Sequence, residues 1–202
     1  MEEQQEDHPT PPDSDASVRT KEQWLRVGRD LCGTIHSTEA LNAFEEAIRL
    51  DPTNVEAYYT KSYILYSLYQ DKDIPEEVLS ASQEAINVAE QALLLNPNDA
   101  DAYFYKGMAL SDQGRYEEAI PAYEQIIRLE PTNFAGYHNK GNALAGLNRY
   151  EEAISMYEHV LHLDPSQRWV YTSIGHALRS LGRETEAQRA YEQARGPLPK
   201  NA

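Results

Sequence analysis

The feature that most constrains the fold of this chain is a pattern that recurs every thirty-four residues between positions 100 and 167. In the first half of each unit, an aromatic residue, a glycine and a leucine keep the same offsets, at Tyr103, Gly107 and Leu110 and again at Tyr137, Gly141 and Leu144. The second half repeats an alanine, a tyrosine, a β-branched residue and a proline, at Ala119, Tyr123, Ile126 and Pro131 and again at Ala153, Tyr157, Val160 and Pro165. Because self-similarity at this period is typical of repeat solenoids, the pattern predicts a stack of similar units that acts as a binding scaffold.

The overall charge narrows the range of partners. The 202 residues carry a formal net charge of -15, and a surface so acidic repels nucleic-acid phosphates and anionic lipids. We therefore expect a protein or peptide partner that is neutral to basic or apolar, and neither nucleic-acid nor membrane binding.

The sequence also suggests a location. The chain starts without the basic and apolar segments of a signal peptide, has no apolar stretch long enough to span a bilayer, and contains one cysteine, Cys32. We therefore expect a cytoplasmic protein.

The same frame extends to both ends of the chain. The first unit carries the repeated residue types at Trp24, Gly28, Leu31, Ala40, Phe44 and Pro52, and the last at Tyr171, Gly175, Leu178, Ala187, Tyr191 and Pro199. Here the chain resembles the tetratricopeptide repeat (TPR) family, whose pattern is W-x-x-L-G-x-x-Y, then A-x-x-x-F, then a closing proline. The resemblance implies an all-α fold, a right-handed α-solenoid of five antiparallel helix pairs. The expected repeats are 21–54, 55–99, 100–133, 134–167 and 168–201, which together form one repeat domain at 21–202.

Two segments depart from the repeat pattern. Residues 1–20 are rich in acids and prolines and poor in apolar residues, so we expect a disordered acidic tail, either a solvating segment or an interaction tail. The second repeat holds eleven extra residues around 70–80, in the turn between its two helices. Because Pro75 is followed by two acids, we expect its second helix to begin early and to lengthen the hairpin. Ser62 also replaces the glycine of the other repeats.

The repeated residues have predictable packing roles. Gly107 and Ala119 should lie where the two helices of the third repeat come closest, and Pro121 should fall within the first turn of its helix, where it is tolerated. In the fifth repeat, Gln188 and Arg195 replace residues that are apolar in the other repeats. A polar outer face terminates a solenoid, so we expect a monomer.

The resemblance implies a concave groove lined by the first helix of each repeat. Counted from each repeat start, its lining positions are the second, fifth, sixth, ninth, twelfth and thirteenth. They give an aromatic stretch followed by a polar one: Tyr59, Tyr63, Tyr66, Phe104, Tyr105, Met108, His138, Asn139, Asn142, Trp169, Thr172, Ser173 and His176. Aromatic residues would anchor a peptide and the asparagines would bind its backbone, while the alternative is that individual tyrosines pack between helices. The same positions also carry Glu56, Asp101 and Asp112.

One known mode of peptide binding does not fit these positions. Family members that bind chaperone tails hold a C-terminal carboxylate with lysine, asparagine and arginine side chains from three first helices. Asn139 matches one of those places, but the others hold Phe104, Met108, Trp169 and Ser173. The resemblance therefore does not extend to this clamp.

Sequence patterns for catalysis are missing. His159 and His162, beside Glu158, provide too few ligands for a metal site, so we expect no metal and no cofactor. The sequence has no glycine-rich phosphate loop and no nucleophile elbow. Recurrent lysines before the glycine or serine, at Lys61, Lys106 and Lys140, indicate a structural or solvating role. We therefore expect a protein-interaction adaptor without catalytic activity. The alternative is a regulatory or substrate-recruiting subunit of a separate enzyme that uses the lengthened second hairpin.

Overall fold

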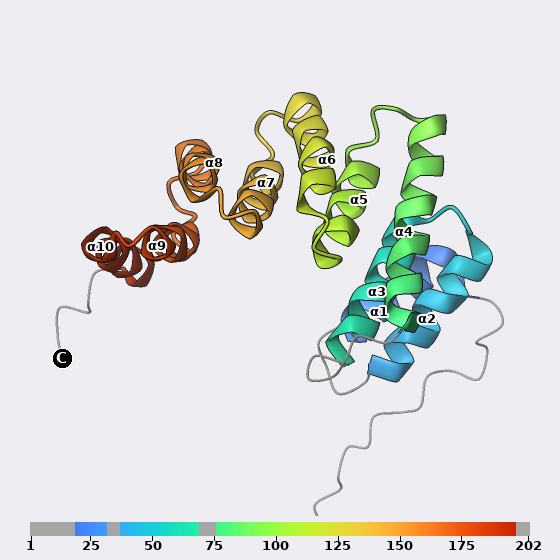
Figure 1. Cartoon of the computed structure of the whole chain (residues 1–202). Helices are drawn as coiled ribbons and strands as arrows, with labels where there is room; N and C mark the ends of the chain where they lie inside the picture. The colour runs from blue at the N-terminus through green and yellow to red at the C-terminus, as the bar shows by residue number, and fades with distance from the viewer. Residues whose placement is uncertain (1–18, 32–36, 69–75, 197–202) are drawn as a thin grey trace, which may run out of the picture.

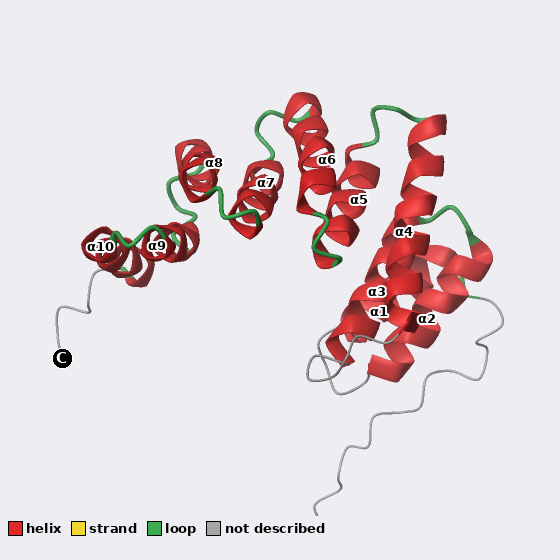
Figure 2. Ribbon diagram, in the orientation of Figure 1, coloured by secondary structure: helices red, strands yellow, loops and turns green. Residues whose placement is uncertain are grey.

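The computed structural model describes residues 19–31, 37–68 and 76–196, and all regular secondary structure in these ranges is helical (Figure 2). The expected all-α fold is confirmed. The helices are α1 (Lys21–Leu31), α2 (Ser37–Leu50), α3 (Val55–Leu68), α4 (Glu76–Leu95), α5 (Ala100–Asp112), α6 (Tyr116–Leu129), α7 (Phe134–Gly146), α8 (Tyr150–Leu163), α9 (Val170–Ser180) and α10 (Glu184–Arg195). The acidic tail up to residue 18, Cys32, the inserted residues 70–75 and Pro199 lie outside the described residues.

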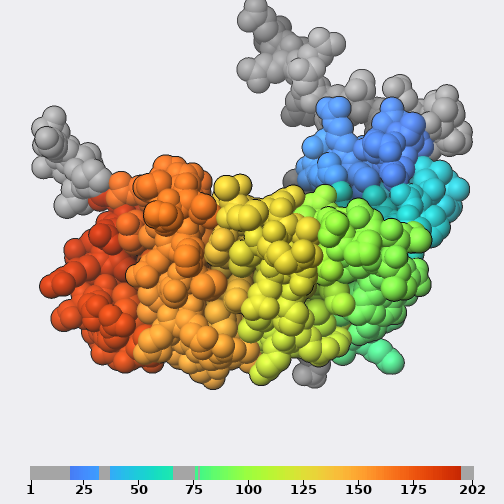
Figure 3. Space-filling model, turned by 90° about the horizontal axis from the view of Figure 1, so that it is seen from above, coloured from blue at the N-terminus to red at the C-terminus, as the bar shows by residue number. Residues whose placement is uncertain are grey.

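The helices stack in pairs along a curved line. Each helix packs against the next one in the chain, from α1 on α2 to α9 on α10. In Figure 1 the chain forms an arch, with α6 and α8 on its outer side and α5 and α7 on its inner side. Contacts between α3 and α5, and between α5 and α7, agree with this arrangement, because helices on the inside of a bend lie closer together. Figure 3 views the molecule from above the arch.

A glycine-to-ring contact joins the two helices of most repeats. A Cβ atom added to Gly107 would lie 2.6 Å from the Tyr123 ring, and a similarly close contact occurs in three more pairs: Gly28 with Phe44, Gly141 with Tyr157 and Gly175 with Tyr191. Only glycine therefore allows the helices to approach this closely. The sequence predicted that Ala119 lies opposite Gly107. In the structure the ring of Tyr123, one helical turn after Ala119, packs against Gly107, and Ala119 is fully buried beside it.

The second repeat changes both sides of this contact. Ser62 stands in the glycine position and is buried, and its hydroxyl donates to the Tyr59 carbonyl at 2.7 Å. Ala89, also buried, occupies the ring position of the register. A smaller second-helix residue leaves room for the serine side chain, which explains why this repeat tolerates the loss of its glycine.

Local polar contacts fix the helix ends. First helices are capped by side chains that accept backbone amides: Asn54 accepts from Ala57, Asp99 from Ala102 and Asn133 from Ala135. Second helices begin with an arginine that binds a glutamate three residues later, in the pairs Arg115–Glu118, Arg149–Glu152 and Arg183–Glu186. Acids in a first turn also interact favourably with the helix dipole.

Two details differ from, or extend, the sequence expectations. Pro121 is the sixth residue of α6, so it lies beyond the first turn, and the amide that it lacks would have donated to the Glu117 carbonyl. Helix α4 has 20 residues, whereas α2, α6 and α8 have 14 each. At the far end of the stack, Gln188 and Arg195 of α10 are exposed, as their polar character requires.

Candidate binding groove

Helices α5 and α7, on the inner side of the arch in Figure 1, hold many of the lining positions named from the sequence, and we call the surface formed by all these positions the inner groove. Its described residues belong to α3, α5, α7 and α9, with Trp169 immediately before α9. Tyr66 lies in α3, but its side chain is outside the described part of the structure. The groove has an aromatic end at α3 and α5 and a mixed end at α7 and α9.

At the aromatic end, Tyr59 supports its neighbours rather than facing solvent. Its side chain is buried, and its ring lies 6.3 Å from that of Tyr63 and 5.5 Å from that of Tyr105, measured between centroids. The Phe104 ring meets the edge of Tyr105 at 5.4 Å. Of these rings, Tyr63 is the one that reaches furthest into solvent, at 50% exposed. Met108, half-buried, packs against the same cluster.

At the mixed end, Trp169 is the exposed ring, at 44%. Its indole nitrogen donates to the Gln167 side chain at 2.6 Å, and its ring meets His138 edge-on at 4.6 Å between centroids. His138 in turn lies 5.7 Å from the Tyr157 ring. Burial lowers the pKa of His138, which favours the neutral imidazole in these two ring contacts.

A small cavity of about 220 Å³ lies between α7, α8 and α9. Its walls include Asn142, Tyr157, Ser173 and His176. The Tyr157 hydroxyl donates to Asn142 Oδ1 at 2.8 Å, which orients that amide, and the Asn142 Nδ2 group lies 3.5 Å from His138 Nδ1. Asn139 is half-buried and Thr172 is exposed. The cavity therefore combines apolar walls with one amide that is held in a fixed direction.

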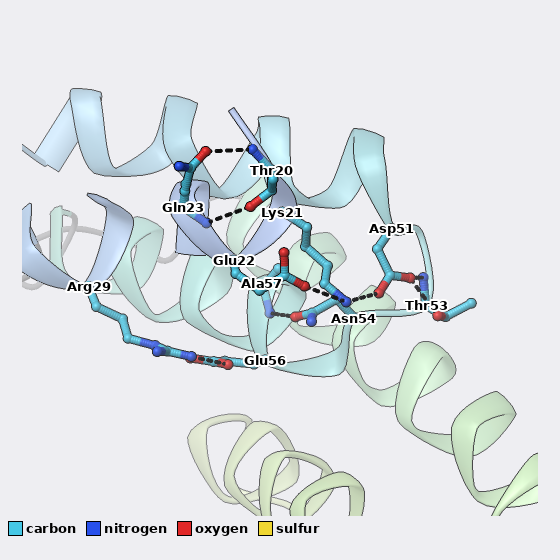
Figure 4. A network of polar contacts seen from close by, with 10 residues as sticks. All are labelled: Thr20, Lys21, Glu22, Gln23, Arg29, Asp51, Thr53, Asn54, Glu56 and Ala57. Carbon is cyan, nitrogen blue, oxygen red and sulfur yellow. Dashed lines mark hydrogen bonds and ion pairs between the residues drawn. The ribbon is translucent and has the colours of Figure 1, made fainter. Parts of the chain in front are cut away.

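Carboxylates border the aromatic end. Arg29 of α1 binds Glu56 of α3 through two hydrogen bonds of 2.5 and 2.6 Å, drawn in Figure 4. The same view shows Lys21 bound to Asp51, which ties the two ends of the first repeat together. Burial, and then the nearby carboxylates of Asp99, Glu130 and Glu56, raise the pKa of Asp101. The Arg29 contact was missed from the sequence, although Arg29 occupies the ninth position of the first repeat, one of the lining positions.

Asp112 forms a second acidic point, at the end of α5. Desolvation of its carboxyl by the surrounding protein raises the pKa to about 6, although the residue is exposed at the surface, and a hydrogen bond with Tyr59 partly opposes that shift. Beside it, the hydroxyl groups of Ser111 and Tyr123 lie 3.0 Å apart. Arg29 neutralises Glu56, but Asp101 and Asp112 make the aromatic end of the inner groove acidic, so this end suits a partner with basic side chains.

The described residues show no arrangement suited to a metal. No group of three or more His, Cys, Asp or Glu side chains among them could hold an ion. His159 instead stacks on Tyr137, with ring centroids 5.3 Å apart. The recurrent lysines form ion pairs between repeats, with Lys61 bound to Glu45, Lys106 to Glu90 and Lys140 to Glu124. Within the described part of the chain, no helix has the length and apolar character needed to cross a membrane.

Comparisons with known proteins agree with the repeat architecture. A family profile described as the tetratricopeptide repeat matches residues 100–133 and 134–167, the bounds found from the sequence, and a second profile with the same description matches 170–194. No curated protein matches the sequence significantly.

Solved structures share the fold at low identity. A thermophilic TPR protein of Thermus thermophilus has a TM-score of 0.70 at 20% identity, covering 90% of this chain and 93% of that one. MamA residues 41 to the end from Desulfovibrio magneticus RS-1 has a TM-score of 0.61 at 20% identity, covering 87% and 93%. MamA AMB-1 gives 0.60 at 18% identity, covering 87% and 95%. At such identities the likeness concerns the fold alone.

Proposed function

Because the chain belongs to the tetratricopeptide repeat family, whose members are protein-interaction scaffolds, we propose that it binds a peptide or protein segment in its inner groove. The observation that carries this proposal is the pair of exposed rings at the two ends of the groove. Tyr63 and Trp169 are 50% and 44% exposed, and each rests on a second ring that holds it in place. Exposed aromatic side chains that are already fixed lose little entropy on binding, and such residues dominate interface energies.

The cavity beside Asn142, at the mixed end of the inner groove, supplies a contact for a peptide backbone. Since Tyr157 donates to Asn142 Oδ1, the amide nitrogen of Asn142 points away from that bond; one of its two hydrogens faces His138 Nδ1, and the other is able to donate to a carbonyl of the partner. Asn139 on the same helix is half-buried and offers both a donor and an acceptor. Sequence-independent backbone contacts at this end complement the side-chain anchors at the two rings.

Charge determines the class of partner. Asp101 and Asp112 lie at the aromatic end of the groove, and the formal net charge of the whole chain is -15. A partner segment with lysine or arginine beside an apolar residue therefore meets complementary charges and rings at the same place. Partners of this kind associate faster at low ionic strength, since salt screens charges that are exposed.

Affinity capture with matched variants tests the proposal. The double variant Tyr63→Ala/Trp169→Ala removes the exposed groove rings, while Leu95→Ala/Phe134→Ala removes two apolar residues of 85% and 41% exposure that are outside the lining positions. We expect partners captured from a lysate of the source organism to fall at least tenfold with the first variant and to stay unchanged with the second. Melting curves of both variants check that the fold is kept. Equal recovery with all three proteins would refute binding through the inner groove.

A further inference from the structure

A second surface lies on the outer side of the stack, away from the inner groove. It is an open cleft of about 490 Å³ between α8 and α10, and its floor is formed by α9. Tyr171, Ile174 and Leu178 of α9 line it, together with Leu161 and Glu158 of α8. We call this surface the outer cleft. At other repeat junctions of this chain, a lysine side chain lies beside the carboxylate that is equivalent to Glu158.

Three earlier repeat junctions are closed by an ion pair. In each, a lysine of a first helix binds a glutamate sixteen residues earlier on the preceding second helix, at 3.0, 2.8 and 2.7 Å: Lys61–Glu45, Lys106–Glu90 and Lys140–Glu124. The lysine side chains are only 20–26% exposed, so their aliphatic parts are largely covered by the junction. The same lysine–glutamate ion pair thus covers the surface between consecutive repeats at each of these three junctions.

This ion pair cannot form at the last junction, between the fourth and fifth repeats. Thirty-four residues after Lys140 and Glu124 the chain has Ile174 and Glu158, so the carboxylate is kept and the lysine is lost. Within the described part of the chain, Glu158 forms no ion pair, whereas Glu186, on the facing wall, is bound by Arg183 at 2.6 Å. Both Ile174 and Glu158 line the outer cleft, which shows that the cleft occupies the place of the missing lysine.

The fifth repeat also lacks a ring contact that the fourth repeat has. In the fourth repeat, His159 stacks on Tyr137 at 5.3 Å and covers the outer side of α7. The equivalent residues of the fifth repeat are Gln193 and Tyr171, and both line the outer cleft. Tyr171 is consequently not covered by an aromatic ring from the second helix of its own repeat. Gln125 holds the equivalent place in the third repeat, so the histidine contact is particular to the fourth repeat.

We propose that the outer cleft binds the side chain of a lysine on a protein partner. The butyl chain of that lysine packs on Leu161 and Tyr171, because Ile174 and Leu178 are only 7% and 6% exposed, and its ammonium group pairs with Glu158, as Lys140 pairs with Glu124 within the chain. Arg189 and His162 also line the cleft, but within the described structure neither forms an ion pair with Glu158, so Glu158 is open to an incoming cation. This site is independent of the inner groove.

An NMR titration with a lysine analogue tests the outer cleft directly. The probe is Nα-acetyl-lysine methylamide added to the ¹⁵N-labelled chain, with the norleucine analogue, which lacks the ammonium group, as the matched control. We expect saturable shifts at the amides of Glu158, Ile174 and Gln193, and at least tenfold weaker binding of the norleucine analogue. Shifts of equal size with both probes, or no saturable shifts at these amides, would overturn the proposal.

Two substitutions separate lysine binding from a general apolar effect. Ile174→Lys restores the residue type of the other junctions, so its ammonium group should pair with Glu158 and abolish binding of the probe. Glu158→Gln keeps the size of an exposed side chain and should weaken binding at least tenfold. The variant Tyr63→Ala/Trp169→Ala should bind the probe as the unaltered chain does. Unchanged probe binding by Ile174→Lys and Glu158→Gln would show that Glu158 does not receive the lysine.

Discussion

The contact between Gly141 and Tyr157 gives the sharpest test of how the repeats are held together. A Cβ atom at position 141 would lie 2.6 Å from Tyr157 Cε1, closer than a carbon contact allows. The ring has little freedom to move, because Tyr157 is 3% exposed and its hydroxyl donates to Asn142. The substitution Gly141→Ser therefore forces a new side chain against a fixed ring.

The two opposing effects have known sizes. Serine is a better helix former than glycine by about 0.5 kcal/mol, whereas overpacking of a dense core costs about 1–3 kcal/mol. Gly141→Ser should therefore destabilise the chain by about 0.5–2.5 kcal/mol. In a Tyr157→Ala background the ring is gone, so the same serine should stabilise by about 0.5 kcal/mol. The second repeat already holds this combination, with Ser62 in the glycine position and Ala89 in the ring position.

A double-mutant cycle measures the difference. Urea unfolding at about 25 °C, followed by far-ultraviolet circular dichroism, gives the unfolding free energies of the parent, both single variants and the double variant. We expect a coupling energy of about 1–3 kcal/mol between the two positions. Additive effects, within about 0.5 kcal/mol, would refute the close glycine-to-ring contact.

Two further predictions concern α5 and α6. Ala119 is fully buried, so Ala119→Leu should lower the unfolding free energy by about 1–3 kcal/mol, and an unchanged melting temperature would contradict its core position. The pKa of Asp112 rises from 3.8 to about 6 on folding, so its contribution to stability is complete below pH 4 and is lost as the pH rises through 6. Asp112→Asn should therefore raise the melting temperature at pH 7 but not at pH 4, by an effect of about 1 kcal/mol because water screens an exposed residue. Equal effects at both pH values would contradict the shifted pKa.

The repeat register could be predicted from the sequence because each unit uses the same contacts. Recurrent glycines, tyrosines and lysines at fixed offsets correspond to ring contacts within repeats and ion pairs between them. The register does not tell which lining residues are exposed. Tyr59 and Tyr63 both belong to the lining positions, yet Tyr59 is 7% and Tyr63 50% exposed, because the Tyr105 ring of the next repeat packs on Tyr59. The difference in exposure between Tyr59 and Tyr63 depends on how each repeat is rotated relative to the next.

Not every contact between repeats follows the repeat pattern. The ion pair between Arg29 and Glu56 joins the ninth position of one repeat to the second position of the next, so no rule based on a single repeat could find it.

The position of Pro121 within its helix was predicted wrongly because helix boundaries are the least certain part of a sequence prediction, and α6 begins at Tyr116. The outer cleft had a visible sequence signal, the isoleucine in the lysine position, but its meaning required the ion pairs of the other junctions.

Hydrogen exchange on a captured complex tests the central claim most directly. The partner isolated with the unaltered chain is mixed with it again, and amide protection is compared with that of the free chain. We expect new protection in α3, α5, α7 and α9, the helices of the inner groove, and none in the Tyr63→Ala/Trp169→Ala variant. Protection confined to the outer helices α6 and α8, and unchanged in that variant, would contradict a scaffold that binds its partner through the inner groove.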